Sequence, residues 1–348
     1  MSTKTLATLD IGGGTQDFLL WRADQTIENA FKMVAPSPTQ IVAARIRRAR
    51  SQGRDIFLHG RLMGGGAMQR AVQEHIAAGL AVWAQPGAGA SMADDLERVR
   101  SLGVRITDQA PPEALPIRTG DLDLDALRET LARFETPWPE RVAVAVCDHG
   151  YSPGASNRKF RFAMWEDFLA GGGNLEDLIT PDPPPAMTRM RALTEQLPGV
   201  LVMDTAAAAL WGALQDPAAA AQAEQGVCVV NLGNMHTVGF LARGRRVLAI
   251  YEHHTGRLGA AKLSDQLRRF IAGELSNDEV FDDMGHGCAR LPEAPTRVSG
   301  PVVITGPRRR LARGLGWRTS APFGDVMLSG CFGLAAAALA REGGRLEG

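Results

Sequence analysis

A carboxylate, three glycines and a hydroxyl follow one another near the N-terminus, in the segment DIGGGTQD at residues 10–17. Apolar runs precede and follow it, at Leu6–Ile11 and Asp17–Trp21. Glycines at the tip of such a hairpin let backbone N–H groups close on a phosphate, where a Cβ atom would obstruct them. Asp10 would then bind Mg²⁺ directly or through its water shell. The residues expected to contact phosphate are Gly12, Gly13, Gly14, Thr15 and Gln16.

Two other phosphate-binding motifs do not fit this segment. The dinucleotide fingerprint needs glycines at its first, third and sixth positions and a following helix, whereas the sixth position here is Asp17 and a strand pattern follows. The sequence also contains no GxxxxGKS/T segment, which excludes a P-loop. The segment is therefore either a phosphate-binding hairpin of another kind or an ordinary Gly-rich hairpin.

A second segment of similar composition, NLGNMHTVG at residues 231–239, also joins two apolar runs, Val227–Leu232 and Thr237–Arg243. Two hairpins of one kind can clamp a polyphosphate from both sides, so the pair indicates phosphate binding more strongly than either segment alone. His236, within the segment, is a candidate catalytic residue. The expected phosphate contacts are Asn231, Gly233, Asn234 and Thr237.

A third segment, VVITGP at residues 302–307, is an apolar strand pattern that ends in a turn and leads into several arginines. A glycine at such a strand end can accept a flat base, and an arginine can stack on it. The alternative is a plain strand-to-helix turn with a solvated basic face. The expected base contacts are Thr305, Gly306, Pro307 and Arg308.

Six of the seven histidines lie in loop sequences rich in Gly, Asp or Thr, where α/β folds carry much of their chemistry. They either act as metal ligands or general bases, or cap turns and contact phosphates. Asp282-Asp283 near His286 leave a metal site open, although no recognised ligand spacing supports one. The residues expected to bind a polar or anionic substrate are His149, Asn157, Arg158, Glu252, His253 and His254.

The run SNRKFR at residues 156–161 follows the strand pattern Val142–Cys147 and predicts either an anion-binding loop or a solvated basic loop. Cys147 and His149 share a strand face, but no third residue completes a nucleophile triad.

The elements that must position these residues repeat along the chain. Three strand patterns fill the first 35 residues, and a helix pattern follows at Thr39–Arg50. The same order of three strands and a helix returns after residue 225, with its helix at Leu258–Ala272. We therefore expect a first lobe at residues 1–214, a second lobe at 215–325 and a returning C-terminal helix at 326–348.

Composition limits the partners that the chain can have. Lys plus Arg and Asp plus Glu both number 38, so the net charge gives no reason to expect nucleic acid or an anionic membrane. The four cysteines form no CxxC pair, which favours reduced thiols over a zinc finger or disulfide framework. Neither a signal peptide nor a membrane span is apparent, so a cytoplasmic location is expected.

These segments, in this order, resemble those of the superfamily of actin, the seventy-kilodalton heat-shock chaperones, and sugar and acetate kinases. Residues 10–17 resemble its first phosphate motif, 231–239 its second and 302–307 its adenosine motif. Residues 205–212 and 328–336 are similar to its two connecting helices. The resemblance implies an α/β fold of two ribonuclease-H-like lobes, the actin-like ATPase fold, with ATP and Mg²⁺ in the cleft between them.

The segments DIGGGTQDFLL, ENAFKMVAPSPTQIVA and EHHTG resemble, more narrowly, a bacterial and archaeal family whose members are sometimes labelled pyruvate formate-lyase activating enzymes. That label implies a radical iron–sulfur enzyme with clustered cysteines, which this sequence lacks, so we do not adopt it.

One position departs from the superfamily pattern. Its second phosphate motif usually begins with Asp, whereas this chain has Asn231. An amide cannot accept a proton from an attacking water, so hydrolysis is expected to be slow or to use another base. Asp204, directly before the first connecting helix, is the preferred replacement, ahead of His236 and Glu252.

We expect an ATP-dependent phosphotransferase or ATPase that acts on a small polar metabolite. The alternative is a nucleotide-gated switch that binds a protein partner and turns over little ATP. Asn231 favours the switch, and the polar loops around His149 and His253 favour a small-molecule site. The sequence indicates neither the substrate nor the oligomeric state.

Overall fold

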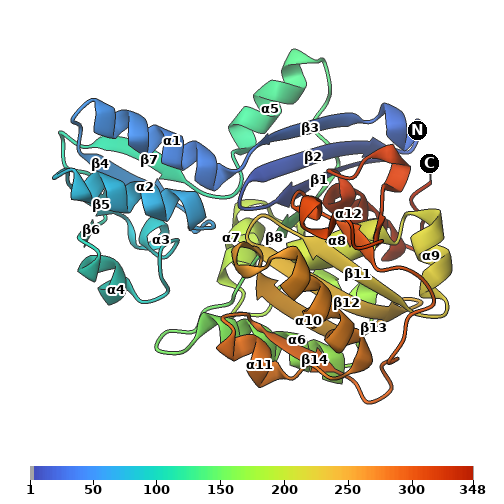
Figure 1. Cartoon of the computed structure of the whole chain (residues 1–348). Coiled ribbons are helices and arrows are strands. Elements are labelled where there is room, and N and C mark those ends of the chain that lie inside the picture. The colour runs from blue at the N-terminus through green and yellow to red at the C-terminus, as the bar shows by residue number, and fades with distance from the viewer. Residues whose placement is uncertain (1–3, 348) are drawn as a thin grey trace.

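The computed structural model describes residues 4–347, which form three sheets with helices around them (Figure 1). The strand order in the first sheet is β3-β2-β1-β8-β10-β9. Strand β2 is antiparallel to β1 and β3, whereas β8 runs parallel to β1 and β10. The apolar sequence of β8, RVAVAV, suits this central position because both faces of the sheet are covered. The strands are β1 (Thr5–Ile11), β2 (Thr15–Arg22), β3 (Phe31–Pro36), β8 (Arg141–Val146), β9 (Ile179–Thr180) and β10 (Leu201–Met203).

The second sheet repeats this topology. Its order is β14-β13-β12-β11-β15-β16, with β12 antiparallel to both of its neighbours and β11, β15 and β16 parallel. Apart from one antiparallel edge strand in each sheet, β9 and β14, each lobe thus has three antiparallel strands followed by two parallel ones. This arrangement confirms the predicted pair of ribonuclease-H-like lobes and the actin-like ATPase fold. The strands are β11 (Val227–Leu232), β12 (His236–Arg243), β13 (Arg246–His254), β14 (Gly287–Arg290), β15 (Val303–Thr305) and β16 (Arg318–Thr319).

A subdomain with its own four-stranded sheet is inserted between β3 and β8. It stands apart from the two lobes in Figure 1, and its sheet has the order β6-β5-β4-β7. Helix α1 packs here with α2, so the sequence-based match of this helix to the second lobe's helix is wrong. The counterpart is α5, which packs on the first sheet through Leu127 and Leu131. The elements are β4 (Ile56–Gly60), β5 (Val82–Ala84), β6 (Val104–Ile106), β7 (Leu115–Thr119), α1 (Pro38–Ser51), α2 (Gly66–Ala77), α3 (Pro86–Gly89), α4 (Leu96–Ser101) and, after the insertion, α5 (Leu124–Arg133).

Helices α8 (Thr205–Ala213) and α12 (Ser329–Ala340) cross between the lobes and are rich in alanine. The crossing is close because glycines stand at the contact. A Cβ atom on Gly212 would collide with the carbonyl oxygen of Ser329, and one on Gly333 with that of Ala208. Small residues therefore set the distance between the two lobes.

The chain after β8 forms a helix where the sequence predicted a binding loop. Helix α6 (Asn157–Ala170) includes most of the run at residues 156–161, and it packs against β13 and β14 of the second lobe. The remaining α-helices are α7 (Thr188–Gln196), α9 (Pro217–Ala223), α10 (Ala260–Ala272) and α11 (Asn277–Asp282). Within residues 4–347, none of the helices combines the length and the apolar character needed to span a bilayer.

Candidate functional site

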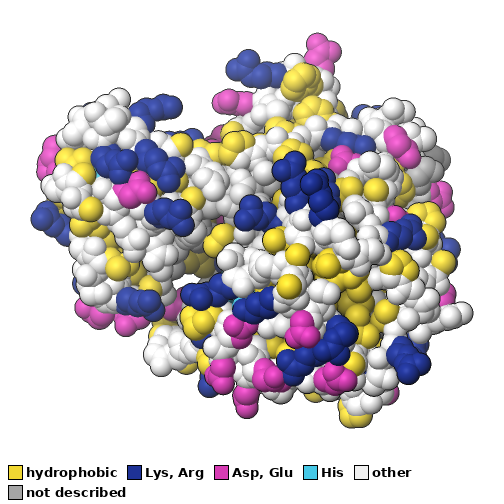
Figure 2. Space-filling view, in the orientation of Figure 1, with side chains coloured by type: hydrophobic (Ala, Val, Ile, Leu, Met, Phe, Trp, Pro, Cys, Tyr) yellow, Lys and Arg dark blue, Asp and Glu magenta, His cyan; other side chains and the backbone are white. Residues whose placement is uncertain are grey.

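A cavity of about 480 Å³ lies where the two lobes and the inserted subdomain meet. The surface is hollowed between the inserted subdomain and the remainder of the molecule in Figure 2. Thirteen of the residues predicted to bind nucleotide, metal or substrate, or to act in catalysis, line this cavity. They are Asp10, Gly12, Gly13, Thr15, His149, Asn157, Asn231, Gly233, Asn234, His236, Thr305, Gly306 and Pro307.

The two glycine hairpins have the same turn. In the first, the Gly12 amide donates to the carbonyl of Thr15 at 2.9 Å, and in the second the Gly233 amide donates to that of His236, also at 2.9 Å. The tips approach each other across the cavity, because a Cβ atom on Gly13 would lie 2.8 Å from the Met235 side chain. Segments far apart in the sequence thus present matching backbone geometry to one space.

Asp10 lies two residues before the turn glycine of the first hairpin, and its Oδ1 is buried with no hydrogen-bond partner among the described residues. Burial raises the pKa of this carboxyl well above its ordinary value, and Asp17 and Asp204 add to the effect. A buried carboxylate oxygen that faces a cavity and lacks a partner fits a hard cation such as Mg²⁺. The residues at this position therefore fit the ion that the fold implies.

Asn231 holds the place of Asp10 in the second hairpin, two residues before its turn glycine. Its Oδ1 lies 2.5 Å from the position that a Cβ atom on Gly306 would take, so Gly306, with φ of 94°, allows β11 and the end of β15 to meet. Thr305 donates from Oγ1 to Oγ of Ser329, 3.0 Å away at the start of α12. The third segment is thus held against the second hairpin and the connecting helix.

Several predicted site residues lie outside the lining of this cavity. Gln16 donates to the carbonyl of Pro36, and Thr237 is fully buried against Thr255. Arg158 donates to the backbone of Phe281 and Gly285. The predicted residues outside the lining are Gly14, Gln16, Arg158, Asp204, Thr237, Glu252, His253, His254 and Arg308.

Arg161 lies at the centre of a buried ion-pair network beside the cavity. Its side chain is 3% exposed and donates to Asp204 at 2.7 and 3.2 Å and to Glu252 at 2.9 Å. Glu252 also accepts from Trp165, at 3.2 Å. Arg161 holds the pKa of Glu252 well below its ordinary value against the opposing effect of burial. From the sequence alone, Arg161 is only one of several charged residues in a predicted loop.

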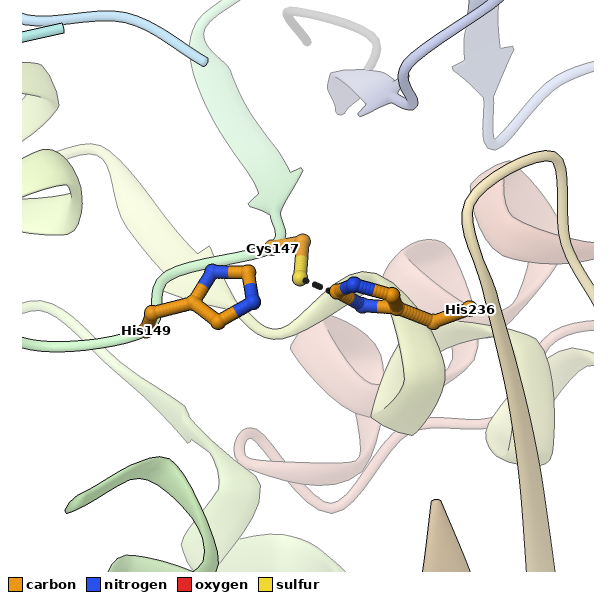
Figure 3. A group of neighbouring side chains, drawn as sticks. All are labelled: Cys147, His149 and His236. Carbon is orange, nitrogen blue, oxygen red and sulfur yellow. Dashed lines mark hydrogen bonds between the residues drawn. The ribbon is translucent and has the colours of Figure 1, made fainter. Parts of the chain in front are cut away.

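Four histidines gather where the second hairpin meets the ends of β13 and β8. The rings of His149 and His236 are 5.0 Å apart, those of His236 and His254 are 5.3 Å apart, and His286 is 4.7 Å from both His236 and His254. In Figure 3 the Cys147 side chain lies between the His149 and His236 rings, with its Sγ 3.5 Å from Nδ1 of His236. The sequence reasoning placed His149, His236 and His254 in a common site but considered His286 only with Asp282 and Asp283.

Burial disfavours the charged form of all four imidazoles, and charged neighbours reverse the effect at one of them. It lowers the pKa of His149 well below the ordinary value, that of His254 to about 4 and that of His286 to about 3. Burial also disfavours the charged form of His236, but Cys147 and Glu252 outweigh it and raise that pKa to about 10. His253, in contrast, lies apart and is 3.1 Å from Asp283.

Solved structures of low sequence identity are similar to this chain. The Ppx/GppA family member of Aquifex aeolicus is 12% identical, covering 88% of this chain and 67% of that chain, with a TM-score of 0.29. The ethanolamine utilization protein EutJ from Carboxydothermus hydrogenoformans is 11% identical over 96% and 89% of the two chains, with a TM-score of 0.30. The match within the PilM–PilN type IV pilus biogenesis complex is 12% identical over 99% of both chains, with a TM-score of 0.36. The fold assignment therefore rests on the strand order of the two sheets and not on these similarities.

No curated protein matches the chain. One family model matches residues 63–311, more than half of the sequence, and its description is "Putative pyruvate format-lyase activating enzyme (DUF1786)". The chain belongs to this family.

Proposed function

We propose that the cavity binds ATP with Mg²⁺ and that the protein is an ATP-dependent phosphotransferase or ATPase acting on a small polar metabolite. The observation that carries this proposal is the pair of identical glycine turns, one on each lobe, with their tips meeting over one cavity. Converging backbone N–H groups stabilise the charge on a polyphosphate without steric obstruction.

Different residues would contact different parts of the nucleotide. The backbone amides at the two hairpin tips, among them those of Gly13, Asn234 and Met235, would hold phosphates, and the turn at Thr305–Pro307 would receive the adenosine. Asp10 would hold Mg²⁺ through its unpartnered oxygen. The ion would neutralise charge that develops on the transferred phosphoryl group.

The substrate end of the cavity is polar. His149, Asn157 and Arg161 line it, and Arg161 brings a guanidinium that is held in place by Asp204 and Glu252. This chemistry suits a polar or anionic metabolite. Because both oxygens of Asp204 accept from Arg161, and one also accepts from the Ala206 amide, we give Asp204 a positioning role rather than that of the base.

The family description names an activating enzyme, and the cysteines of this chain do not fit an iron–sulfur cluster. Such clusters are held by several thiolates together. Cys228, Cys288 and Cys331 are buried on β11, β14 and α12, and of the four cysteines only Cys147 lines the cavity. We derive no chemical step from that description.

Asn231 supports a second candidate, a nucleotide-gated switch that turns over little ATP. Asn231→Asp restores a carboxylate at the position that matches Asp10. If the amide limits turnover, this change should raise the rate of ATP hydrolysis, by up to the 10²–10⁴-fold that a positioned base contributes, with nucleotide affinity retained. The measurement is phosphate release with and without candidate metabolites.

The matched control is Asn234→Asp, which adds the same charge at the tip of the same hairpin and should give no gain. An unchanged or lower rate in Asn231→Asp would show that the proton acceptor lies elsewhere. Rapid wild-type transfer to a metabolite would exclude the switch.

A further inference from the structure

Three of the clustered histidines come from three neighbouring strand ends. His236 begins β12 and pairs in register with His254, the last residue of β13. His286 immediately precedes β14, whose Gly287 pairs with Glu252 on β13. One ring nitrogen from each of these three histidines lies within 4.8 Å of the others. Strand pairing in the second lobe therefore fixes the geometry of the group.

Within residues 4–347, the imidazole of His286 is buried without a hydrogen bond that would explain its position. It is 1% exposed, and neither of its ring nitrogens has a hydrogen-bond partner among the described residues. A buried polar group left in this state destabilises the fold, so such groups call for a specific explanation. A ligand between the three rings would supply the missing partner.

His236 shows which of its nitrogens is available for such a ligand. Its Nδ1 faces the Glu252 carboxylate at 3.2 Å and Cys147 Sγ at 3.5 Å. The two nitrogens of an imidazole point in different directions, so Nε2 remains for a ligand on the other side. A carboxylate behind a histidine is the usual support of a metal-binding imidazole, because it fixes the ring orientation and increases its basicity.

We propose that His236, His254 and His286 bind a divalent transition-metal ion of the Zn²⁺ class, with Glu252 supporting His236. Imidazole suits Zn²⁺, Cu²⁺, Fe²⁺ and Ni²⁺ better than Mg²⁺, so this site is distinct in chemistry from the one at Asp10.

Three protein ligands leave a coordination position open, as in catalytic metal sites. His236 also lines the cavity, so the three-histidine group lies beside the space where a substrate would bind. The open position takes water or an anionic oxygen of a bound metabolite. Cys147 is not a ligand in this arrangement, because its sulfur lies on the Nδ1 side of His236.

The test is metal binding by the purified full chain in the absence of nucleotide, so that its failure is separate from failure of the ATP proposal. The apo protein is prepared by chelation and dialysis, and Zn²⁺ is titrated by calorimetry. Co²⁺ is titrated in parallel by absorption spectroscopy. We expect one ion per chain, a metal-dependent rise in melting temperature, and a Co²⁺ spectrum without a thiolate charge-transfer band.

Variants assign the ligands. His254→Gln and His286→Gln should weaken Zn²⁺ binding by at least about 100-fold, since even losing a supporting residue costs 10–100-fold. His254 is partly exposed, so its variant keeps the test decisive if His286→Gln fails to fold. The matched control is His59→Gln, on β4 of the inserted subdomain, which should bind Zn²⁺ as the wild type does.

Absence of stoichiometric Zn²⁺ and Co²⁺ binding by the wild type would overturn the proposal. Wild-type affinity in both His254→Gln and His286→Gln would do the same. A thiolate charge-transfer band that disappears in Cys147→Ser would replace this ligand set with the alternative grouping of Cys147, His149 and His236.

Discussion

At the scale of single residues, Asp17 is a buried acid at the base of the first hairpin. Its carboxyl is 6% exposed at the base of the hairpin, where β2 leaves the turn, and one of its oxygens lacks a hydrogen-bond partner among the described residues. Burial raises its pKa from 3.8 to about 7. The neutral acid is thus favoured in the folded state below about pH 7.

A pH-dependent stability follows from this raised pKa. Between pH 4 and 7 the unfolded chain releases the Asp17 proton while the folded chain retains it, so the wild-type free energy of unfolding falls as the pH rises. Asp17→Asn removes this dependence. The variant should therefore gain stability relative to the wild type between pH 5 and pH 7, by up to about 2–3 kcal/mol at roughly 1.4 kcal/mol per pH unit.

Urea denaturation of both proteins at pH 5 and pH 8 measures the difference, and the titrations of groups that do not interact with Asp17 cancel in the comparison. The exposed Asp167→Asn on α6 is the control and should show a much smaller change. An equal stability difference at the two pH values would contradict the raised pKa.

The sequence identified the residue types at the site better than their partners. Strand-end glycines and polar loops carry local patterns, so Asp10, Gly12, Gly233 and His236 could be located as lining candidates. The Arg161 network could not, because its partners Asp204 and Glu252 lie 43 and 91 residues away along the chain. No local pattern encodes such separations.

At the scale of elements, the α8–α12 crossing controls how closely the lobes approach. Gly333 on α12 meets the carbonyl of Ala208 on α8, and Gly330 on α12 lies against the Asp10 carboxylate. Helix α12 therefore contacts both the other connecting helix and the first hairpin.

Gly333→Ala should destabilise the protein by about 1–3 kcal/mol, the usual cost of overpacking. The overpacking cost must exceed the gain in helix propensity, because alanine stabilises a helix by roughly 1 kcal/mol relative to glycine. The control is Gly256→Ala, where no atom lies within 4 Å of the added carbon. Chemical denaturation measures both variants, and wild-type or greater stability in Gly333→Ala would contradict the close crossing.

The periodicity of the sequence predicts the type of an element but not the element that it packs against. The paired runs of three strands were predicted because alternating and apolar segments are short and bounded by turns. Helix α1 belongs to the inserted subdomain and not, as the sequence had suggested, to the first lobe. Its apolar face predicts a helix but does not show which sheet the helix covers. Helix α6 was missed because its first turn is dense in charged and amide residues that suggested a loop.

At the scale of the whole molecule, two similar lobes and an inserted subdomain enclose one cavity. Its walls combine glycine turns from both lobes with residues of the insertion, among them Met63, Gln69 and Asp94. Asp94 accepts from the Ser152 amide and from Asn157 across this space. A ligand that fills the cavity would therefore contact both lobes and the inserted subdomain at once, and would stabilise their arrangement.

The most direct test of nucleotide binding is the melting temperature of the full chain with and without ATP and Mg²⁺. A ligand present at 100 times its dissociation constant stabilises the folded state by about 2.7 kcal/mol, which a thermal-shift assay resolves. We expect a clear rise for the wild type at millimolar ATP–Mg²⁺ and the loss of most of it in Asp10→Ala. No rise in the wild type, or an equal rise in Asp10→Ala, would contradict nucleotide binding between the paired hairpins.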